Sequence, residues 1–448
     1  MTPLPLPPGR FGLPWLGETL AIVKSNHGFY TDRVAKYGPI FKTRLFGNDF
    51  VVFSGHEAFH RFATDPRIER GDADPITAEA MFRNSLALID GVEHRTRKTL
   101  MLRGIGYRSA IEAYMPRMQQ LIQSMVDAWA AAEQPRAILP DLQLFSARLT
   151  GELYTGDRSE EAAHEINDAA AAVRGAFMAL PVPLPWTAYG RAQNGRNRLE
   201  RIVEDAIARH VDAPGEYDDV TSRMVLAARE AGIPVETLSG DLRHLIFASQ
   251  GGYFVPLTLV TMILGQHPEI RERARAEVLA VAPDGDVTMD QVERMPYLES
   301  ISKELRRYFA MNSATFFGRV KEEIEVGGYR IPAGWAAAGG IHVTMRNPDV
   351  FADPDTFDPD RFEASREAAL APGSYVPHGD GQATHHRCPG ENIVTVAVAQ
   401  YLVLLLRRLE WSIPAQDLSL TNELFPLPAS GLSVAFREHA PAPTGGAT

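Results

Sequence analysis

Apolar residues recur at every third or fourth position through most of the chain, which places them on one face of an α-helix. Two early runs and one late run alternate instead and carry glycine-rich turns, as β-strands do. The pattern predicts a mainly helical protein with a small β portion, in which residues 39–47 and 49–55 form a hairpin about Gly47 and Asn48. The predicted helical stretches are residues 94–105, 110–132, 194–211, 238–279, 295–310 and 395–409, and the late strands lie within residues 323–340.

The proline-rich start of the chain has a different pattern. Proline fixes φ and keeps the residue before it out of the helical region, so we expect residues 1–18 to form an extended arm. Residues 19–437 show no repeat and no clear linker, and we expect them to form a single large domain. Residues 438–448 are rich in Ala, Pro and Gly and are expected to be a disordered tail.

Composition narrows the class of protein. The chain has 448 residues, of which 45% are hydrophobic and 23% charged, as in ordinary globular proteins. A net charge of -11 without a basic stripe argues against binding to nucleic acid. The N-terminus lacks the features of a signal peptide, and no run of 18 uncharged apolar residues indicates a membrane anchor. We therefore expect a cytoplasmic protein.

The chain has a single cysteine, Cys388, in the stretch THHRCPGE. An internal disulfide is excluded, which leaves inert packing, a reactive thiol or a metal ligand. Cationic neighbours and the amides at the start of the following helix favour the thiolate, which is the form that binds metals. One alternative is a zinc or redox site made of His378, His385, His386 and Cys388, but structural zinc sites commonly arrange four ligands as two spaced pairs, a pattern that this sequence lacks.

Several motifs, taken in order, resemble the cytochrome P-450 family of haem-thiolate enzymes. Glu304 and Arg307 stand one helical turn apart, a loop rich in Asp and Pro ends on Arg361, and the cysteine segment follows with an apolar helix behind it. Residues 93–98 and 245–254 also fall where the family has two of its helices, so the resemblance covers nearly the whole chain. It implies the cytochrome P-450 fold and a buried structural ion network at the two arginines and the glutamate.

The resemblance also implies a cofactor, haem b, with Cys388 as the metal ligand. An axial thiolate pushes electron density onto the iron and favours cleavage of an O–O bond. His94, Lys98, Arg319 and His386 are expected to hold the haem propionates, because carboxylates form strong hydrogen bonds with cationic donors. The alternative for Lys98 and Arg319 is an exposed surface charge.

The chain departs from the family in its long central helix. Members that activate dioxygen carry an acid and an alcohol for proton delivery where this chain has Gly251 and Gly252. Protons would then come from water, from substrate or from a side chain such as Gln250 or Tyr253, and these four residues are the candidate catalytic positions. Pro256 predicts a kink or an opening of the helix above the iron, although the glycines could instead only make room for haem or substrate.

The cysteine loop is longer than in most of the family, and HRCPGE is similar to the fatty-acid peroxygenase branch, whose helical Arg-Pro pair is missing here. The N-terminal third is similar to the cyanobacterial retinoid-hydroxylating branch. The resemblance implies hydroxylation or a related oxidation of an apolar small molecule, driven by hydrogen peroxide or by a ferredoxin or reductase. A haem-thiolate isomerase, lyase or dehydratase and a non-catalytic haem-binding sensor are the alternatives.

Overall fold

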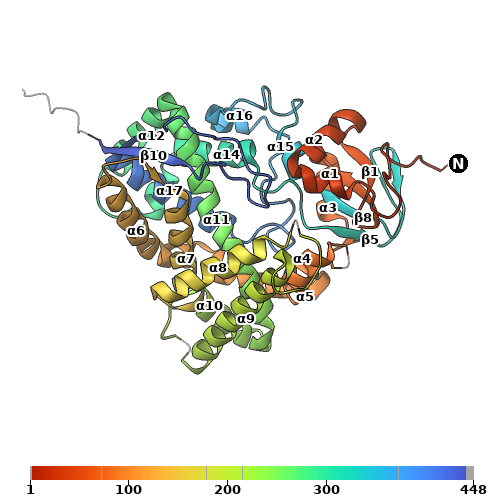
Figure 1. The fold of residues 1–448 in the computed structure, drawn as a ribbon, viewed down its shortest axis with the longest axis horizontal. Helices are drawn as coiled ribbons and strands as arrows, with labels where there is room; N and C mark the ends of the chain where they lie inside the picture. Colours follow the sequence, from red (N-terminus) through yellow and green to blue (C-terminus); the bar gives the residue numbers. More distant parts are fainter. Residues whose placement is uncertain (1–2, 72, 178, 214, 372, 440–448) are drawn as a thin grey trace, which may run out of the picture.

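The computed structural model describes residues 3–71, 73–177, 179–213, 215–371 and 373–439. Helices fill most of the molecule, and a smaller strand-rich part lies beside them, as the sequence pattern predicts (Figure 1). The α-helices are α1 (Thr19–Lys24), α2 (Asn26–Tyr37), α3 (His56–Thr64), α4 (Ile76–Phe82), α5 (Gly91–Ile105), α6 (Arg108–Ala130), α7 (Leu139–Thr155), α8 (Glu160–Arg174), α9 (Ala188–Asp212), α10 (Val220–Glu230), α11 (Leu238–Gln266), α12 (Pro268–Val281), α13 (Met289–Glu293), α14 (Pro296–Phe309), α15 (Ile341–Met345), α16 (Ala364–Glu367) and α17 (Glu391–Arg408).

Helix α11 crosses the middle of the molecule, and most of its side chains are buried. Among the described residues it forms, with the short turn before it, the one stretch that is long and apolar enough to cross a membrane, and 83% of its most apolar window is buried within the protein. The predicted stretch 238–279 is two helices, because Pro268 begins α12 and His267 before it leaves the helical region with φ -122° and ψ 74°.

Within the described residues the strands form three small sheets. They are β1 (Ile40–Leu45), β2 (Asn48–Phe53), β3 (Ile68–Glu69), β4 (Arg136–Ala137), β5 (Gly318–Val320), β6 (Ile324–Val326), β7 (Tyr329–Ile331), β8 (Ala336–Gly339), β9 (Leu409–Ser412) and β10 (Ser433–Glu438). The largest sheet has the order β1-β2-β8-β5-β3. Strands β1 and β2 pair antiparallel with Ile40 opposite Phe53, which confirms the predicted hairpin, and β2 runs parallel to β8.

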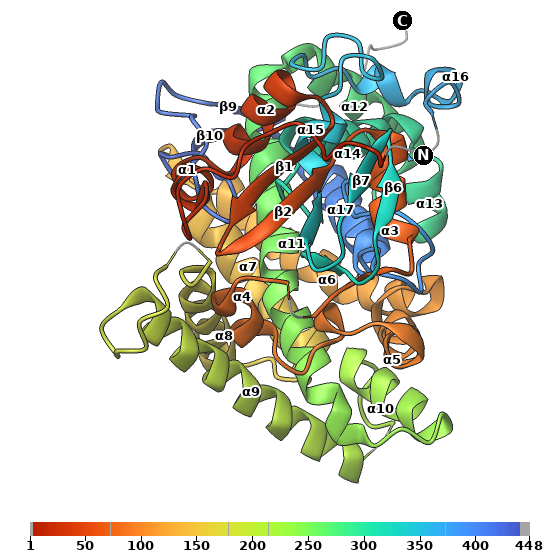
Figure 2. The same cartoon turned by 90° about the vertical axis from the view of Figure 1, so that its right-hand side faces the viewer.

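The largest sheet is buried on both faces. Alternate residues of β2 enter different clusters: Phe50 and Val52 pack with residues of α1 and α2, whereas Val51 and Phe53 pack with residues of α3 and of the chain start. Figure 2 shows this part from the strand side, with α9 and α10 at the end of the molecule opposite α2. The largest core joins α4 to α14 around α11 and α17, whereas α15 packs in a small separate cluster with Phe59 and Val376.

The chain start and the segment around Asn422 both contact this strand-rich part, whereas β10, the last described strand, pairs with β9 on the far side of the molecule (Figure 1). The backbone N–H of Lys42 donates to the Pro8 carbonyl at 2.8 Å, so the non-helical residues before α1 lie along β1. Near the other end, the Asn422 side chain donates to the carbonyls of Val23 and Lys24 and accepts from the N–H of Asn26. Segments almost 400 residues apart, with |i−j| of 399 for one bond, are therefore fastened together.

The predicted ion network is present and buried. Arg307 donates to both carboxylate oxygens of Glu304 at 2.6 and 2.8 Å, and neither side chain is exposed. Arg361 lies 3.4 Å from the same carboxylate, and the N–H of Asp358 donates to it at 2.8 Å. The remaining N–H groups of Arg307 donate to backbone carbonyls, one of them that of Pro354. The network thus fastens α14 to the Asp- and Pro-rich loop.

Breaking this network should destabilise the fold. Removing one partner of a buried ion pair costs about 3–5 kcal/mol, because the other charge is left uncompensated. We expect Glu304→Ala to reduce the yield of folded protein sharply and to lower its melting temperature, followed by circular dichroism. The matched control is Glu299→Ala, which removes an exposed partner of Lys303 on the same helix and should cost at most about 1 kcal/mol. Equal melting temperatures in the two variants would contradict the assignment.

Candidate active site

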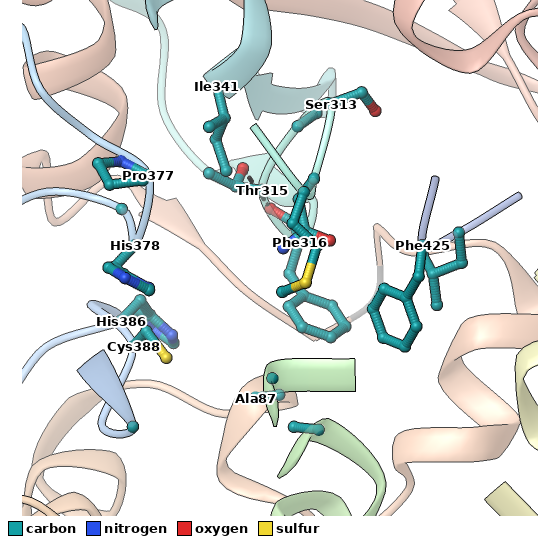
Figure 3. A pocket seen from close by; sticks show the side chains of 18 of the residues that line it. Ala87, Ser313, Thr315, Phe316, Ile341, Pro377, His378, His386, Cys388 and Phe425 are labelled. Atoms are coloured by element: carbon teal, nitrogen blue, oxygen red, sulfur yellow. Dashed lines mark hydrogen bonds between the residues drawn. The ribbon is translucent and has the colours of Figure 1, made fainter. Parts of the chain in front are cut away.

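A cavity of about 470 Å³ opens between α11 and the cysteine loop. Its walls come from α4, α5, α11, α14, the segment before β5, the cysteine loop and the segment between β9 and β10. Figure 3 shows Cys388, His386 and His378 on one side of it and Phe316 and Phe425 on the other. Aromatic and aliphatic side chains form most of the remaining wall, so the cavity has one polar end in an apolar chamber.

The cysteine loop presents the thiol of Cys388 to the cavity. The N–H of Cys388 donates to the His378 carbonyl at 2.9 Å, which closes the loop on itself. Gly379 and Gly381 adopt φ of 84° and 88°, a conformation that other residues rarely adopt, so the glycines permit this turn. The Cys388 side chain is open to the cavity yet lies deep within the protein.

The charges around Cys388 act in opposite directions. Burial raises the pKa of the thiol, whereas the Lys98 ammonium and the N–H of Gly390 lower it. A buried thiolate would therefore gain from a bound metal cation. The alternative site made of His378, His385, His386 and Cys388 is not supported, because no group of three potential metal-ligating side chains occurs in the described part of the chain.

Three of the four predicted propionate ligands meet beside the cysteine loop. Lys98 is 1% exposed, and its ammonium donates to the Arg387 carbonyl at 2.5 Å. The rings of His94 and His386 lie 4.1 Å apart, and Nε2 of His386 lies 2.8 Å from a carboxylate oxygen of Asp90. Lys98 and His386 line the cavity, whereas buried His94 packs behind them with its Nε2 unpartnered among the described residues.

Burial sets the protonation of this cluster. It lowers the pKa of His94 to about 3, and the cations nearby act in the same direction, so this imidazole is neutral. Burial likewise lowers the pKa of Lys98 to about 8, against the opposing effect of the cysteine. An anion placed at this end of the cavity would reverse these effects, because it favours the charged form of each base.

Arg319 is not brought to the cavity. Its guanidinium donates to Asn48 at 3.1 Å and to the Gly334 carbonyl at 2.9 Å on the sheet, and it is not among the residues that line the cavity. Neighbouring residues of a strand point to opposite faces, and Gly318 is the one that faces Arg70, whose Nη1 would lie 2.8 Å from an added Cβ. The prediction for Arg319 is therefore corrected in favour of Arg70.

Arg70 is the residue that the sequence did not reveal. It lies just after β3, is 7% exposed, lines the cavity, and stacks on Phe62 at 4.4 Å. Burial lowers its pKa to about 10, and its Nη1 has no partner among the described residues. The pairing of β3 with β5 and the hydrogen bond from the N–H of Arg70 to Asp90 hold Arg70 in this place, and a two-residue strand gives no periodic signal in the sequence.

The four residues expected on the central helix divide between two faces. Gln250 is buried away from the cavity, where its amide donates to Thr150 at 3.0 Å, and this corrects its predicted role as a side chain that delivers protons. Gly252 and Tyr253 line the cavity. The phenol of Tyr253 is buried without a hydrogen-bond partner among the described residues, and burial raises its pKa well above the ordinary value.

Gly251 is required by packing against an aromatic ring. A Cβ at this position would lie 2.3 Å from the ring of Phe425, so the place of a side chain is already filled. At Gly252 an added Cβ would meet only Val394, at 3.5 Å. The helix stays helical from residue 238 to residue 266, so the predicted opening at Pro256 does not occur.

The geometry fits a haem group. One end of the cavity carries an exposed thiol, an unpartnered nitrogen of Arg70 and the buried Lys98, and His94 packs behind this wall with its Nε2 also unpartnered among the described residues. A planar apolar group with two carboxylates and a metal ion would bind the thiolate through the metal and the cationic cluster through the carboxylates. The unpartnered Nε2 of His378 lies in the same wall. Fold and site together define the class of thiolate-ligated haem proteins.

The chain belongs to the cytochrome P-450 family, whose family model matches residues 7–436. A cytochrome P-450 120 of Synechocystis is 30% identical over 439 residues, covering 96% of each chain. An abscisic acid 8'-hydroxylase of Arabidopsis thaliana is 26% identical over 455 residues, covering 97% of this chain and 93% of the relative. The cofactor is accordingly haem b, and the chain is a monooxygenase or peroxygenase of this family.

Solved structures agree with this assignment. The cyanobacterial CYP120A1 with bound retinoic acid superposes with a TM-score of 0.89 at 28% identity, covering 97% of this chain and 100% of the other. A variant of cytochrome P-450 OleT in complex with arachidonic acid superposes with a TM-score of 0.81 at 19% identity, over 97% and 99% of the two chains, which shows the shared fold.

The assignment of Arg70 to the haem-binding wall predicts that loss of Arg70 weakens haem retention and that loss of Arg319 does not. A charge-assisted hydrogen bond contributes about 1.5–3 kcal/mol, so Arg70→Leu should weaken haem retention by roughly that amount. The rate of haem transfer to an excess of apomyoglobin measures this effect. The control, Arg319→Leu, lies outside the cavity and should transfer haem at the wild-type rate. Faster loss from the Arg319 variant than from the Arg70 variant would restore the original assignment.

Ligation by Cys388 predicts a spectroscopic signature. The reduced carbonyl complex of the wild type should absorb far to the red of a histidine-ligated haem, and Cys388→Ser should lose this band, because an alcohol replaces the thiolate. His385→Ala is the control, since it removes an imidazole of the rejected zinc site and should leave the band unchanged. Retention of the band in Cys388→Ser would contradict thiolate ligation.

Proposed function

We propose that this enzyme hydroxylates, or oxidises in a related way, an apolar small molecule, and that it uses hydrogen peroxide as its oxidant. The thiolate-ligated haem supplies the oxygen-transfer chemistry when it is bound. The residues of this chain decide the rest: they hold the cofactor, shape an apolar chamber and determine which protons can reach the reacting oxygen. The absence of the family's acid and alcohol from α11 is the observation that supports peroxide most directly.

The steric environment of α11 strengthens this inference. At residue 251, where the family places an acid, the ring of Phe425 occupies the space that a side chain would need. At residue 252, where the family places an alcohol, a glycine leaves the wall of the cavity open. Packing against Phe425 therefore excludes an acid at residue 251. At residue 252 there is room for an alcohol, but the side chain is missing.

The neighbouring polar groups do not replace the relay. The hydroxyl of Ser249 donates to the phenol oxygen of Tyr154 at 2.7 Å, and the amide of Gln250 is held by Thr150. The Gln250 amide is thus directed into the contact between α11 and α7, whereas Ser249 and Tyr154 line the cavity with their hydroxyl groups bonded to each other. We infer that water or a polar group of the substrate provides the acid-base step that peroxide still requires, since a proton must shift between its two oxygens.

The lining of the chamber supports an apolar substrate. Phe82, Phe177, Phe247, Phe316 and Phe425 all contribute to its wall. A chamber lined in this way favours ligands whose binding removes apolar surface from water. The bound retinoic acid of the cyanobacterial relative makes retinoids reasonable members of a first substrate panel.

We also propose that the enzyme acts in the cytoplasm. A ligating thiol has to stay reduced, and Cys388 is the only thiol of the chain. The apolar stretch that includes α11 is buried inside the protein, which fits a core helix better than a membrane span.

The choice of oxidant can be tested directly. We expect the wild type to convert members of the panel with added peroxide, and with dioxygen and a surrogate reductase to release most of its electrons as peroxide. Product formed per electron consumed measures this coupling. Tight coupling to dioxygen together with no peroxide activity would contradict the proposal and indicate an ordinary reductase-dependent monooxygenase.

Two variants separate the positions of the missing relay. Gly252→Thr should fit, because the nearest atom to an added Cβ is 3.5 Å away, and it should raise coupling with dioxygen if the alcohol is the missing element. An acid at residue 251 needs the ring removed, so it is introduced as Gly251→Asp with Phe425→Ala. Phe425→Ala alone is its control. No gain in coupling from either relay variant would show that the lost relay does not limit the reaction with dioxygen.

A further inference from the structure

The cavity contains polar atoms that the haem does not explain. Among the described residues that line it, five have a buried side-chain nitrogen or oxygen without a hydrogen-bond partner: Arg70, Asp74, His244, Tyr253 and His378. Arg70 and His378 belong to the haem-binding wall. The carboxyl of Asp74 lies within the electrostatic reach of Arg70, and the phenol of Tyr253 lies near that of Tyr154. His244 remains to be explained.

His244 lies in the apolar chamber. It precedes Ala248 and Gly252 at intervals of four residues on α11, and all three line the cavity, so it shares the face of the helix that covers the reaction site. Eight residues correspond to roughly 12 Å along a helix axis. The ring of His244 lies 4.7 Å from that of Phe82 and 6.0 Å from that of Phe316. The imidazole is thus a polar group set among aromatic rings.

Burial disfavours the charged form of the His244 imidazole, and this bears on its hydrogen bonding. Burial lowers its pKa to about 3, and the charges of Lys98 and Arg243 act in the same direction. A neutral imidazole offers one donor and one acceptor. Buried polar atoms in proteins nearly always have a partner, so an unpartnered nitrogen in a ligand chamber indicates that a ligand provides one.

We propose that His244 determines substrate specificity by hydrogen-bonding the hydroxyl group of an alcohol whose remaining body is apolar. A hydroxyl group both donates and accepts, as a neutral imidazole does. A carboxylate would need a cation, but the basic residues of the cavity are engaged elsewhere. Arg70 and Lys98 lie at the haem-binding end, and Arg306 donates to Ser302 and Thr395. This inference rests on the proposed function and names the substrate class for the same site.

The position of His244 also orients the substrate. A hydroxyl held beside Phe82 and Phe316 is two helical turns away from Gly252, so it is not the group that meets the reacting oxygen. A carbon of the apolar part of the substrate, remote from the hydroxyl group, would instead lie near Gly252 at the reaction site. His244 acts as a positioning residue, and its loss should broaden the distribution of oxidised positions.

Binding of matched probes to the haem-loaded protein tests the proposal without turnover. The probes are dodecanol and all-trans-retinol, each compared with the hydrocarbon that lacks the hydroxyl and with the corresponding acid. Dissociation constants come from the change in the ferric haem spectrum. A hydrogen bond of ordinary strength corresponds to about a two- to twelve-fold difference in affinity. We expect at least one alcohol to bind more tightly than its hydrocarbon by a factor in this range.

Variants assign the preference to His244. His244→Leu should remove the preference for the alcohol and leave the affinity for the hydrocarbon unchanged. His244→Gln should restore part of it, because an amide also donates and accepts. Phe247→Leu is the matched control, since it alters an apolar neighbour in the same wall and should weaken alcohol and hydrocarbon alike.

Four results would overturn the proposal. They are a wild type that binds neither alcohol more tightly than its hydrocarbon, an equal loss for both probes in His244→Leu, tightest binding of the acids, and a nitrogen-ligated ferric spectrum that His244→Leu abolishes. The last would place the imidazole on the iron. Failure of oxidation with both oxidants would instead reject the proposed function, because the binding measurement does not depend on it.

Discussion

The site depends on keeping one negatively charged sulfur inside a chamber that disfavours charge. Burial raises the pKa of the Cys388 thiol and the carboxylate of Glu391 adds to this, whereas the cation on Lys98, the N–H of Gly390 and the cation on Arg306 lower it. The rest of the cavity follows from this constraint. The cluster of bases beside the loop would gain stability from an anionic cofactor, and the mostly apolar wall offers the sulfur few polar partners.

Periodicity predicted most of the helical core, because those helices bury one regular face. It missed α7, α8 and α10 as separate elements, and it joined α11 to α12, whose boundary is set by the single proline at residue 268. The strand-rich part was predicted only where alternation and a turn coincide, as at the first hairpin. The remaining pairings of the sheet join residues that are distant in sequence, and no local pattern encodes them.

In the candidate site, too, residues placed by local structure were predicted from the sequence, whereas a residue placed by a long-range strand pairing was not. Cys388, His386 and Lys98 were predicted from their spacing within a loop or helix, and local structure carries all three to the cavity, where their roles stay predictions. Arg319 lies one position after Gly318, the strand residue that faces Arg70, and its side chain points away from the cavity. Arg70 was not predicted, because the pairing of two strands distant in sequence brings it to the cavity. The prediction for Gln250 was wrong because this residue lies on the opposite side of α11 from the cavity. Neighbouring residues of a helix lie about 100° apart, so Gln250 faces α7 while Gly252 faces the cavity.

The order in which the chain is synthesised adds a consequence. Phe425 fills the space above Gly251, and Asn422, a few residues earlier, is bonded to the backbone around α1 and α2. The chamber is therefore closed by a segment that leaves the ribosome about 400 residues after the helices it contacts, as the |i−j| of 399 records. The helices synthesised early therefore leave the apolar wall of the cavity exposed to solvent until the segment around Phe425 has been synthesised. We therefore expect the complete chamber, and with it the full haem-binding wall, to form only after this segment has been synthesised.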